Sequence, residues 1–167
     1  MTGFVIDVGS LPSGVNRVRV ELQAQELGLP EGEWAGPVIG ALEVERNGDR
    51  ISVRGKLQAA ARVECVRCLR NCDLPVEAPF EVFAERAGPG FRLEEEELER
   101  DDYMKFHDGR ILDLREEARE ALLLELPIAP CCREDCLGLC PRCGADLNEG
   151  PCACGARSSG LAPERDV

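Results

Sequence analysis

The chain has 167 residues, of which 4% are aromatic, and a formal net charge of -12. This length fits one domain with a small appended module, and aliphatic side chains must supply most of the core. The acidic balance argues against a protein that coats nucleic acid indiscriminately. We find neither a signal peptide nor a membrane span in the sequence, and therefore expect a cytoplasmic protein.

The first half of the chain predicts an antiparallel meander. Apolar and polar side chains alternate, with the period of half-buried strands, in residues 16–23, 38–45, 51–64 and 74–84. Asn47-Gly48-Asp49 has the turn chemistry of a hairpin between the second and third of these strands. Trp34 lies in a loop rich in glycine and proline, and we expect it to pin that loop to the core.

The segment that follows the strands predicts a loop, a turn and one helix. Residues 94–102, EEEELERDD, have acidic side chains at seven of nine positions and are typical of a solvated loop. We expect His107 in a solvated turn and a short strand at residues 111–114. A helix should then begin at the cap residue Asp113, with Glu116 three residues on, and end before Pro127.

Together these elements predict an α+β fold. We expect an antiparallel curved sheet or partial barrel covered by one main helix, in residues 1–126. A C-terminal Cys-rich zinc module should occupy residues 127–155 and pack on the sheet. Residues 156–167 are expected to form a flexible tail.

Cysteines carry the strongest chemical signal: the chain has ten, seven of them within residues 131–154. In a reducing compartment such a pattern favours metal binding over structural disulfides. Two cysteines separated by two residues place their sulfurs roughly 3.8 Å apart, as a tetrahedral zinc site requires. This spacing occurs at Cys65/Cys68 and at Cys140/Cys143, and Cys152-Ala153-Cys154 follows the second pair.

We therefore predict two zinc sites. The ligands of one are Cys140, Cys143, Cys152 and Cys154. The other combines Cys65 and Cys68, at the tip between the third and fourth strands, with Cys136 and either Cys132 or Cys131. Two cysteines are then left over, namely Cys72 and the other one of the Cys131/Cys132 neighbours. The spacing also permits one ion held by Cys132, Cys136, Cys140 and Cys143, with the hairpin pair free. Ligation by sulfur alone indicates structural metal, so we expect no enzyme.

A basic segment lies within this acidic chain. Between Arg46 and Arg70 there are seven basic and two acidic residues, a local charge of +5. In the third strand basic and apolar positions alternate, so one of its faces is basic. That face is either a solvated outer surface or a surface that contacts phosphates. The candidate nucleic-acid-binding residues are Arg50, Arg54, Lys56, Arg62 and Arg67.

The run LREEAREALLLELPIAPCCREDCLGLCPRCGADLNEGPCAC, together with the upstream CVRCL, resembles the YceD family, named for large ribosomal RNA subunit accumulation. The likeness extends over roughly residues 38–154. It implies a non-enzymatic ribosome biogenesis factor needed for synthesis, processing or stability of large-subunit (23S) ribosomal RNA. The implied partners are that RNA or its precursor particle, and a ribosomal protein or RNA-processing enzyme. The alternative is a zinc-stabilised protein adaptor that recruits a nuclease or ribosomal protein without contacting RNA.

Overall fold

The computed structural model describes residues 3–88 and 104–154. The chain divides into two compact units, the first formed by Met1–Arg62 and Pro75–Leu126 and the second by Val63–Leu74 and Pro127–Val167. The second unit therefore takes in residues 63–74 as well as the segment after residue 126. The expected module limits at residues 127–155 stay a prediction, and the tail at residues 156–167 lies outside the described residues.

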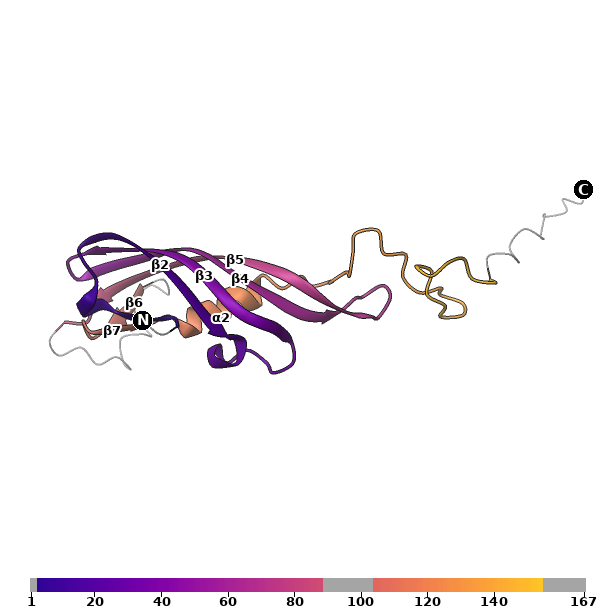
Figure 1. Ribbon diagram of the computed structural model, residues 1–167, viewed down its shortest axis with the longest axis horizontal. Helices are drawn as coiled ribbons and strands as arrows, with labels where there is room; N and C mark the ends of the chain where they lie inside the picture. The colour runs from indigo at the N-terminus through magenta and orange to yellow at the C-terminus, as the bar shows by residue number, and fades with distance from the viewer. Residues whose placement is uncertain (1–2, 89–103, 155–167) are drawn as a thin grey trace, which may run out of the picture. The chain divides into compact units, whose positions relative to one another are not determined.

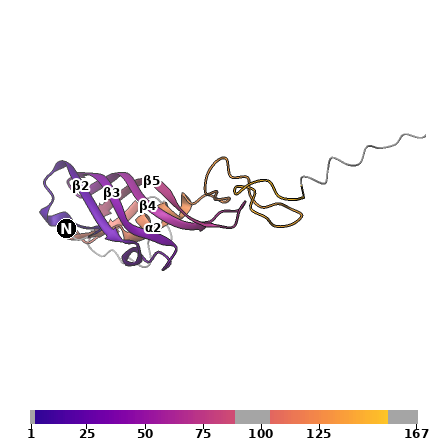
Figure 2. The same cartoon turned by 45° about the vertical axis from the view of Figure 1, so that its right-hand side comes forward.

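The first unit is built around a five-stranded sheet with the strand order β2-β3-β4-β5-β6. Pairing is antiparallel between β2 and β3 and between β3 and β4, as predicted, whereas β6 lies parallel to β5 and was not predicted. Figures 1 and 2 show that the sheet is curved and does not close into a barrel. Its strands are β2 (Gly14–Gln23), β3 (Trp34–Asn47), β4 (Arg50–Glu64), β5 (Asn71–Arg86) and β6 (Met104–His107).

A second, two-stranded sheet pairs β1 (Val5–Asp7) with β7 (Ile111–Asp113) in antiparallel fashion. Short 3-10 helices occupy Val8–Ser10 (η1) and Ala24–Leu27 (η2).

The α-helix, α2 (Arg115–Leu124), buries Ala118 and Leu122, and both views show it along one face of the curved sheet (Figures 1 and 2). The α+β prediction is thus confirmed. The predicted cap differs in detail: Leu114 is the N-cap residue, and the Asp113 carboxylate accepts a hydrogen bond from the Arg115 backbone N–H at 3.1 Å.

Strict alternation along the long strands forms the core of the first unit. In β4 the side chains of Ile51, Val53 and Leu57 are buried while their neighbours face solvent, because successive strand residues point to opposite faces. Trp34 is only 6% exposed, which confirms its expected packing in the core. Gly55 is required by the close approach of β3: a Cβ there would lie 2.1 Å from the backbone oxygen of Ala41.

His107 is buried in the first unit, so its expected place in a solvated turn is wrong. It ends β6, is 4% exposed, and its Nδ1 accepts a hydrogen bond from the Gly109 backbone N–H at 2.9 Å. Burial lowers the pKa of His107 below its usual value and outweighs the opposing effects of Asp49 and Asp108. The reason for the difference is the parallel pairing of β6 with β5, which the sequence pattern did not reveal.

Two other expectations bear on this part of the chain. The acidic run at residues 94–102 lies outside the described residues. Within residues 3–88 and 104–154, no helix combines the length and apolar character needed to cross a membrane.

The buried imidazole predicts that the first unit loses stability in mild acid. In the folded chain the pKa of His107 is lowered from its ordinary value of 6.5, so the unfolded chain binds the proton more tightly. Stability is therefore complete above about pH 6.5 and falls as the pH drops below that value. Denaturant unfolding followed by Trp34 fluorescence at several pH values measures this slope. In His107→Asn, which keeps a hydrogen-bond acceptor, the slope between pH 7 and pH 5 should be shallower; an unchanged slope would contradict the assignment.

Candidate metal centres

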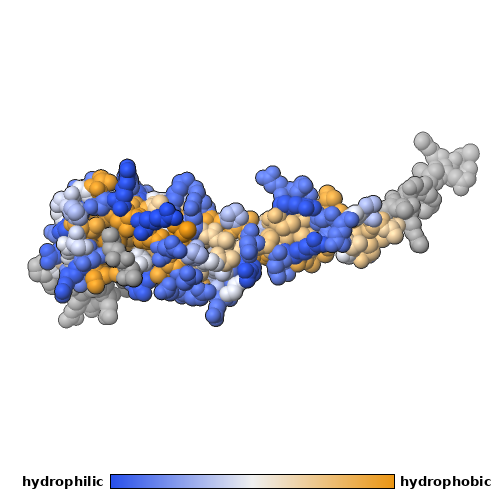
Figure 3. Space-filling model, viewed as in Figure 1, coloured by the Kyte–Doolittle hydropathy of each residue, from blue (hydrophilic) through white to orange (hydrophobic). Residues whose placement is uncertain are grey.

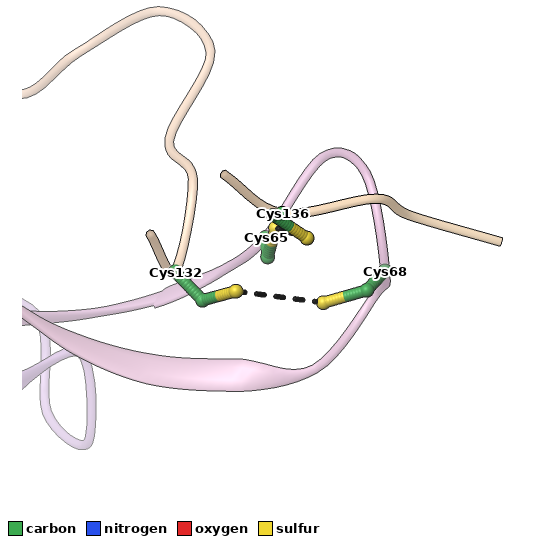
Figure 4. A group of neighbouring side chains, drawn as sticks. All are labelled: Cys65, Cys68, Cys132 and Cys136. Carbon is green, nitrogen blue, oxygen red and sulfur yellow. Dashed lines mark hydrogen bonds between the residues drawn. The ribbon is translucent and has the colours of Figure 1, made fainter. Parts of the chain in front are cut away.

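The first cysteine cluster joins two segments that are far apart in the sequence. Cys65 and Cys68 come from the turn between β4 and β5, and Cys132 and Cys136 from the segment after α2; in Figure 4 their sulfurs point toward one another. All four sulfurs lie within 4.8 Å of one another, with Cys65···Cys136 at 3.8 Å and Cys68···Cys132 at 3.7 Å. Four thiolates at about 2.3 Å from one ion have this separation, so the cluster could hold a tetrahedral metal ion.

The second cluster is local in sequence. The sulfurs of Cys140, Cys143, Cys152 and Cys154 also lie within 4.8 Å of one another. The structure thus brings together the two sets of four that the sequence analysis preferred, with Cys132 in the first set and Cys131 packed beside it. The alternative set of Cys132, Cys136, Cys140 and Cys143 is divided between the two clusters.

The two CxxC turns have the same backbone hydrogen bonds. In the first, the N–H of Leu69 donates to the carbonyl of Cys65 at 2.8 Å, and the N–H of Cys65 donates to the carbonyl of Arg70 at 2.9 Å. In the second, Gly144 donates to Cys140 at 2.8 Å and Cys140 to Ala145 at 2.8 Å. The chain therefore forms the same turn twice, and we call this turn a knuckle. In each knuckle these backbone hydrogen bonds hold two sulfurs close together.

The two knuckles differ at the residue after the second cysteine. In both knuckles the backbone of this residue has a left-handed conformation, with φ of 71° at Gly144 and 57° at Leu69. Glycine takes this conformation without strain, whereas a residue with a Cβ does not. Leu69 is also 56% exposed, so packing recovers little of that cost. The first knuckle is therefore strained at Leu69.

The thiols of the first cluster differ strongly in acidity. Backbone N–H groups, that of Cys132 foremost, lower the pKa of Cys65 to about 6. Burial, with the neighbouring thiols, raises the pKa of Cys132 to about 12. One thiol therefore ionises readily, while a further thiolate beside it is costly. A divalent cation at the centre reverses this balance, because it stabilises every thiolate that faces it.

The second cluster repeats this electrostatic pattern. Backbone N–H groups, led by that of Arg142, lower the pKa of Cys140 to about 6. Its neighbour Cys143 is the main cause that raises the pKa of Cys154 to about 12. Both clusters thus combine one thiol that is easily ionised with one that needs a cation to ionise near neutral pH.

Cysteine also forms the buried interior of the second unit. Among its described residues, the buried hydrophobic side chains are Cys65, Cys68, Cys136 and Cys140. Large aliphatic residues of this unit lie in solvent instead, with Val66, Leu69 and Leu137 between 51% and 66% exposed. A unit with so small an apolar core needs another source of stability, and a bound metal ion supplies it in small domains.

The predicted nucleic-acid-binding residues are distributed over both units. In the first unit, the cations on β4 are paired with glutamates on β5: Arg50 with Glu85 at 3.4 Å, Arg54 with Glu81 at 2.7 Å and Lys56 with Glu77 at 2.5 Å. The charge of this row is therefore largely balanced. The sequence shows that Glu77, Glu81 and Glu85 share one face of β5, since they alternate with its apolar positions, but it does not show which residues of β4 they meet.

The other two candidates lie apart from that row. Arg62 is near the end of β4, where its backbone N–H donates to the carbonyl of Glu33 at 2.6 Å. Arg67 lies in the first knuckle of the second unit, and its guanidinium donates to the carbonyls of Glu134 and Cys136 at 3.1 and 3.0 Å. Arg67 therefore braces the first cluster, a role that sequence reasoning did not assign to it.

The structure thus defines a small protein with a curved, mostly antiparallel sheet in one unit and two four-cysteine clusters that could hold metal ions in the other. The family model described as "Large ribosomal RNA subunit accumulation protein YceD" matches residues 53–162, and the chain belongs to this family. The expected family assignment is thus confirmed.

Several curated proteins are similar to the chain. A Mycobacterium leprae protein is 35% identical over 115 residues, and a Mycobacterium tuberculosis (strain H37Rv) protein is 36% identical over 111 residues. These alignments cover 69% and 66% of this chain but 51% of each relative. The chain thus spans about half the length of these relatives.

A plant relative carries the family description in its name. The maize large ribosomal RNA subunit accumulation protein YCED homolog 1, chloroplastic, is 25% identical over 194 residues, which cover 97% of this chain and 65% of the maize protein. No solved structure matches the chain.

The strain at Leu69 predicts that Leu69→Gly stabilises the second unit. Glycine removes the clash of the left-handed conformation, and we expect a gain of about 1 kcal/mol in the free energy of unfolding. The reciprocal change Gly144→Leu should destabilise the unit by a similar amount, because open space surrounds a Cβ there and only the backbone strain acts.

Denaturant-induced metal release from the loaded chain measures both effects. Leu69→Ala is the matched control, since it shortens the exposed side chain but keeps the strain. An equal gain from alanine and glycine would show that exposure, not backbone strain, is the cost at this position.

Proposed function

We propose that this chain acts in the accumulation of large-subunit ribosomal RNA, as a non-enzymatic factor whose second unit is organised by two zinc ions. The match of the family model over residues 53–162 carries this proposal. The name of the maize relative supports it in addition.

The donor set favours zinc. Four thiolates in a tetrahedral arrangement suit zinc or iron, whereas magnesium and calcium prefer oxygen ligands. The first site would use Cys65, Cys68, Cys132 and Cys136, and the second Cys140, Cys143, Cys152 and Cys154. With all four positions taken by sulfur, neither ion would keep a position open for water or substrate. Zinc in these sites would therefore serve the fold of the second unit and not a reaction.

Two modes of action fit such a factor. In the first, the basic row on β4 contacts ribosomal RNA backbone. The ion pairs to Glu77, Glu81 and Glu85 weigh against it, because a cation already balanced by a carboxylate releases fewer counterions on binding phosphate.

In the second mode the chain is a protein adaptor. Val66, Leu69 and Leu137 favour it, since the second unit exposes them to solvent, and Figure 3 shows apolar beside hydrophilic surface there. This unit has more carboxylates than arginines among its described residues, and each zinc with four thiolates adds two negative charges. Its surface thus suits a basic protein, such as a ribosomal protein, better than RNA.

Metal analysis tests the zinc sites. The purified chain should contain close to two zinc ions, and Cys68→Ser or Cys154→Ser close to one, because each variant removes one ligand of one site. Removal of zinc should unfold the second unit, which loses on the order of 10 kcal/mol of metal-binding energy, while Trp34 fluorescence of the first unit changes little. Cys72→Ser is the matched control and should keep two ions. A wild-type content near one, or iron in place of zinc, would contradict the assignment.

Depletion of the protein in cells tests the function. We expect the ratio of large-subunit to small-subunit ribosomal RNA to fall, and wild-type protein to restore it. Cys65→Ser/Cys68→Ser, which disrupts the first site, should fail to restore it. An unchanged RNA ratio in fully depleted cells would refute the proposed role.

The same cells distinguish the two modes of action. If β4 contacts RNA, the triple change Arg50→Glu, Arg54→Glu and Lys56→Glu weakens co-sedimentation with large-subunit precursors. The complementary change of Glu77, Glu81 and Glu85 to glutamine, which frees the cations, then strengthens it. If the chain is an adaptor, both triple variants sediment as the wild type does, and Leu69→Gly lowers co-sedimentation.

A further inference from the structure

One side chain from the loop of the second cluster reaches a sulfur of the first. Asn148 lies between Cys143 and Cys152, and its Nδ2 donates a hydrogen bond to Sγ of Cys136 at 3.5 Å. Cys136 is a member of the first cluster. The amide of Asn148 therefore connects the loop of the second cluster to a sulfur of the first cluster.

The carbonyl end of the same amide holds the backbone around that sulfur. Oδ1 of Asn148 accepts hydrogen bonds from the Leu137 backbone N–H at 2.9 Å and from the Arg133 guanidinium at 2.8 Å. Asn148 thus forms hydrogen bonds both with the sulfur of Cys136 and with the backbone of the residue that follows it. A single asparagine satisfies three donor or acceptor groups around this one ligand.

Asn148 is itself fixed in place by its own loop. Oδ1 of Asp146 accepts from the backbone N–H of Asn148 at 2.8 Å and from its Nδ2 at 2.7 Å. The carboxylate of Asp146 is also paired with Arg70 of the first knuckle at 2.7 Å, and Arg70 pairs with Glu149 as well. The loop that bears Asn148 is therefore tied to the first knuckle by a charge network.

Backbone hydrogen bonds complete this interlock. Leu147 donates to the carbonyl of Gly138 at 2.9 Å, Leu139 forms an isolated antiparallel bridge with Asp146, and Leu139 also donates to the carbonyl of Arg67 at 3.0 Å. The short segment between the two clusters is thus held on one side by the second loop and on the other by the first knuckle. These contacts connect the loop of the second cluster to the first knuckle.

We propose that Asn148 is a positioning residue that couples the two metal sites, so that metal in the second site raises the affinity of the first. This inference rests on the proposed function in one respect, namely that both clusters hold metal. Metal bound by Cys140, Cys143, Cys152 and Cys154 closes the loop of residues 144–151. An ordered loop has already lost its conformational entropy. The hydrogen bond from Asn148 to Cys136 then forms at a smaller entropic cost than it does from a loop that is still flexible.

The contact has the chemistry that a metal thiolate site requires. A zinc ion with four thiolates carries a net charge of two minus, so a neutral N–H donor at a sulfur stabilises the loaded site more than the empty one. Partners of this kind change metal affinity by about 10- to 100-fold when they are removed. Coupling between two binding sites is reciprocal. Whatever the factor by which metal in the second site raises the affinity of the first, metal in the first site must raise the affinity of the second by that same factor.

Chelator competition on the full-length, zinc-loaded chain tests the proposal. Cadmium-113 spectra resolve the two sites, and Cys68→Ser and Cys154→Ser assign the signals. In Asn148→Asp, which replaces the N–H donor by an oxygen and keeps the acceptor for Leu137, the first site should lose affinity about 10- to 100-fold. Asn71→Asp adds the same charge at an exposed position of the same unit and is the matched control; it should leave the affinity of the first site within about twofold of wild type.

A double-mutant cycle separates coupling from a merely structural role. Cys154→Ser should lower the affinity of the first site in the wild-type chain, and should lower it much less in the Asn148→Asp chain, because the link is already broken. If Asn148→Asp folds poorly, the comparison of Cys154→Ser with the wild-type chain still tests the coupling. A lower metal affinity of the first site in Cys154→Ser then shows it.

The outcomes are distinct. Additive effects of the two changes, or a first site indifferent to Cys154→Ser, would overturn the coupling while leaving the metal sites intact. A wild-type chain that binds fewer than two metal ions would instead overturn the proposed metal sites. A signal of the first site that shifts in Asn148→Asp but not in Asn71→Asp supports direct contact at the Cys136 sulfur.

Discussion

The second unit depends on the backbone hydrogen bonds of its two CxxC knuckles. In each knuckle the residue after the second cysteine turns into the left-handed region and closes a hydrogen bond back to the first cysteine. This turn places two sulfurs side by side and directs N–H groups toward them. These N–H groups lower the pKa of Cys140, and at Cys65 they add to the larger effect of the Cys132 N–H, which comes from another segment. The sulfurs from the remaining segments then complete two sets of four.

The rest of the second unit follows from that arrangement. Among the described residues of this unit the buried hydrophobic side chains are cysteines, so the stability that an apolar core gives to larger domains must come from elsewhere. Polar contacts around the sulfurs, from Arg67, Arg70 and Asn148, hold the segments in place. The small interior also explains why Val66, Leu69 and Leu137 are exposed, because a unit organised around thiols has little buried space for large side chains.

The first unit is held by ordinary burial. Alternation along β3 and β4 places one row of side chains in the core, and Gly55 lets the two strands approach closely. On the outer face the basic row of β4 meets the acidic row of β5. Exposed ion pairs of this kind contribute little to stability, but they neutralise the surface, and this changes which partners that face can attract.

The sequence by itself determined the features that are properties of a single segment: the strand periodicity, the helix before Pro127, the two CxxC turns and the membership of the YceD family. Only the tertiary structure decided that glutamates of β5 face the cations of β4, that β6 buries His107 and that Asn148 reaches Cys136. The physical reason is that spacing along the chain determines which residues share a face or a turn. Which segments become neighbours depends instead on register and loop closure between residues far apart in sequence.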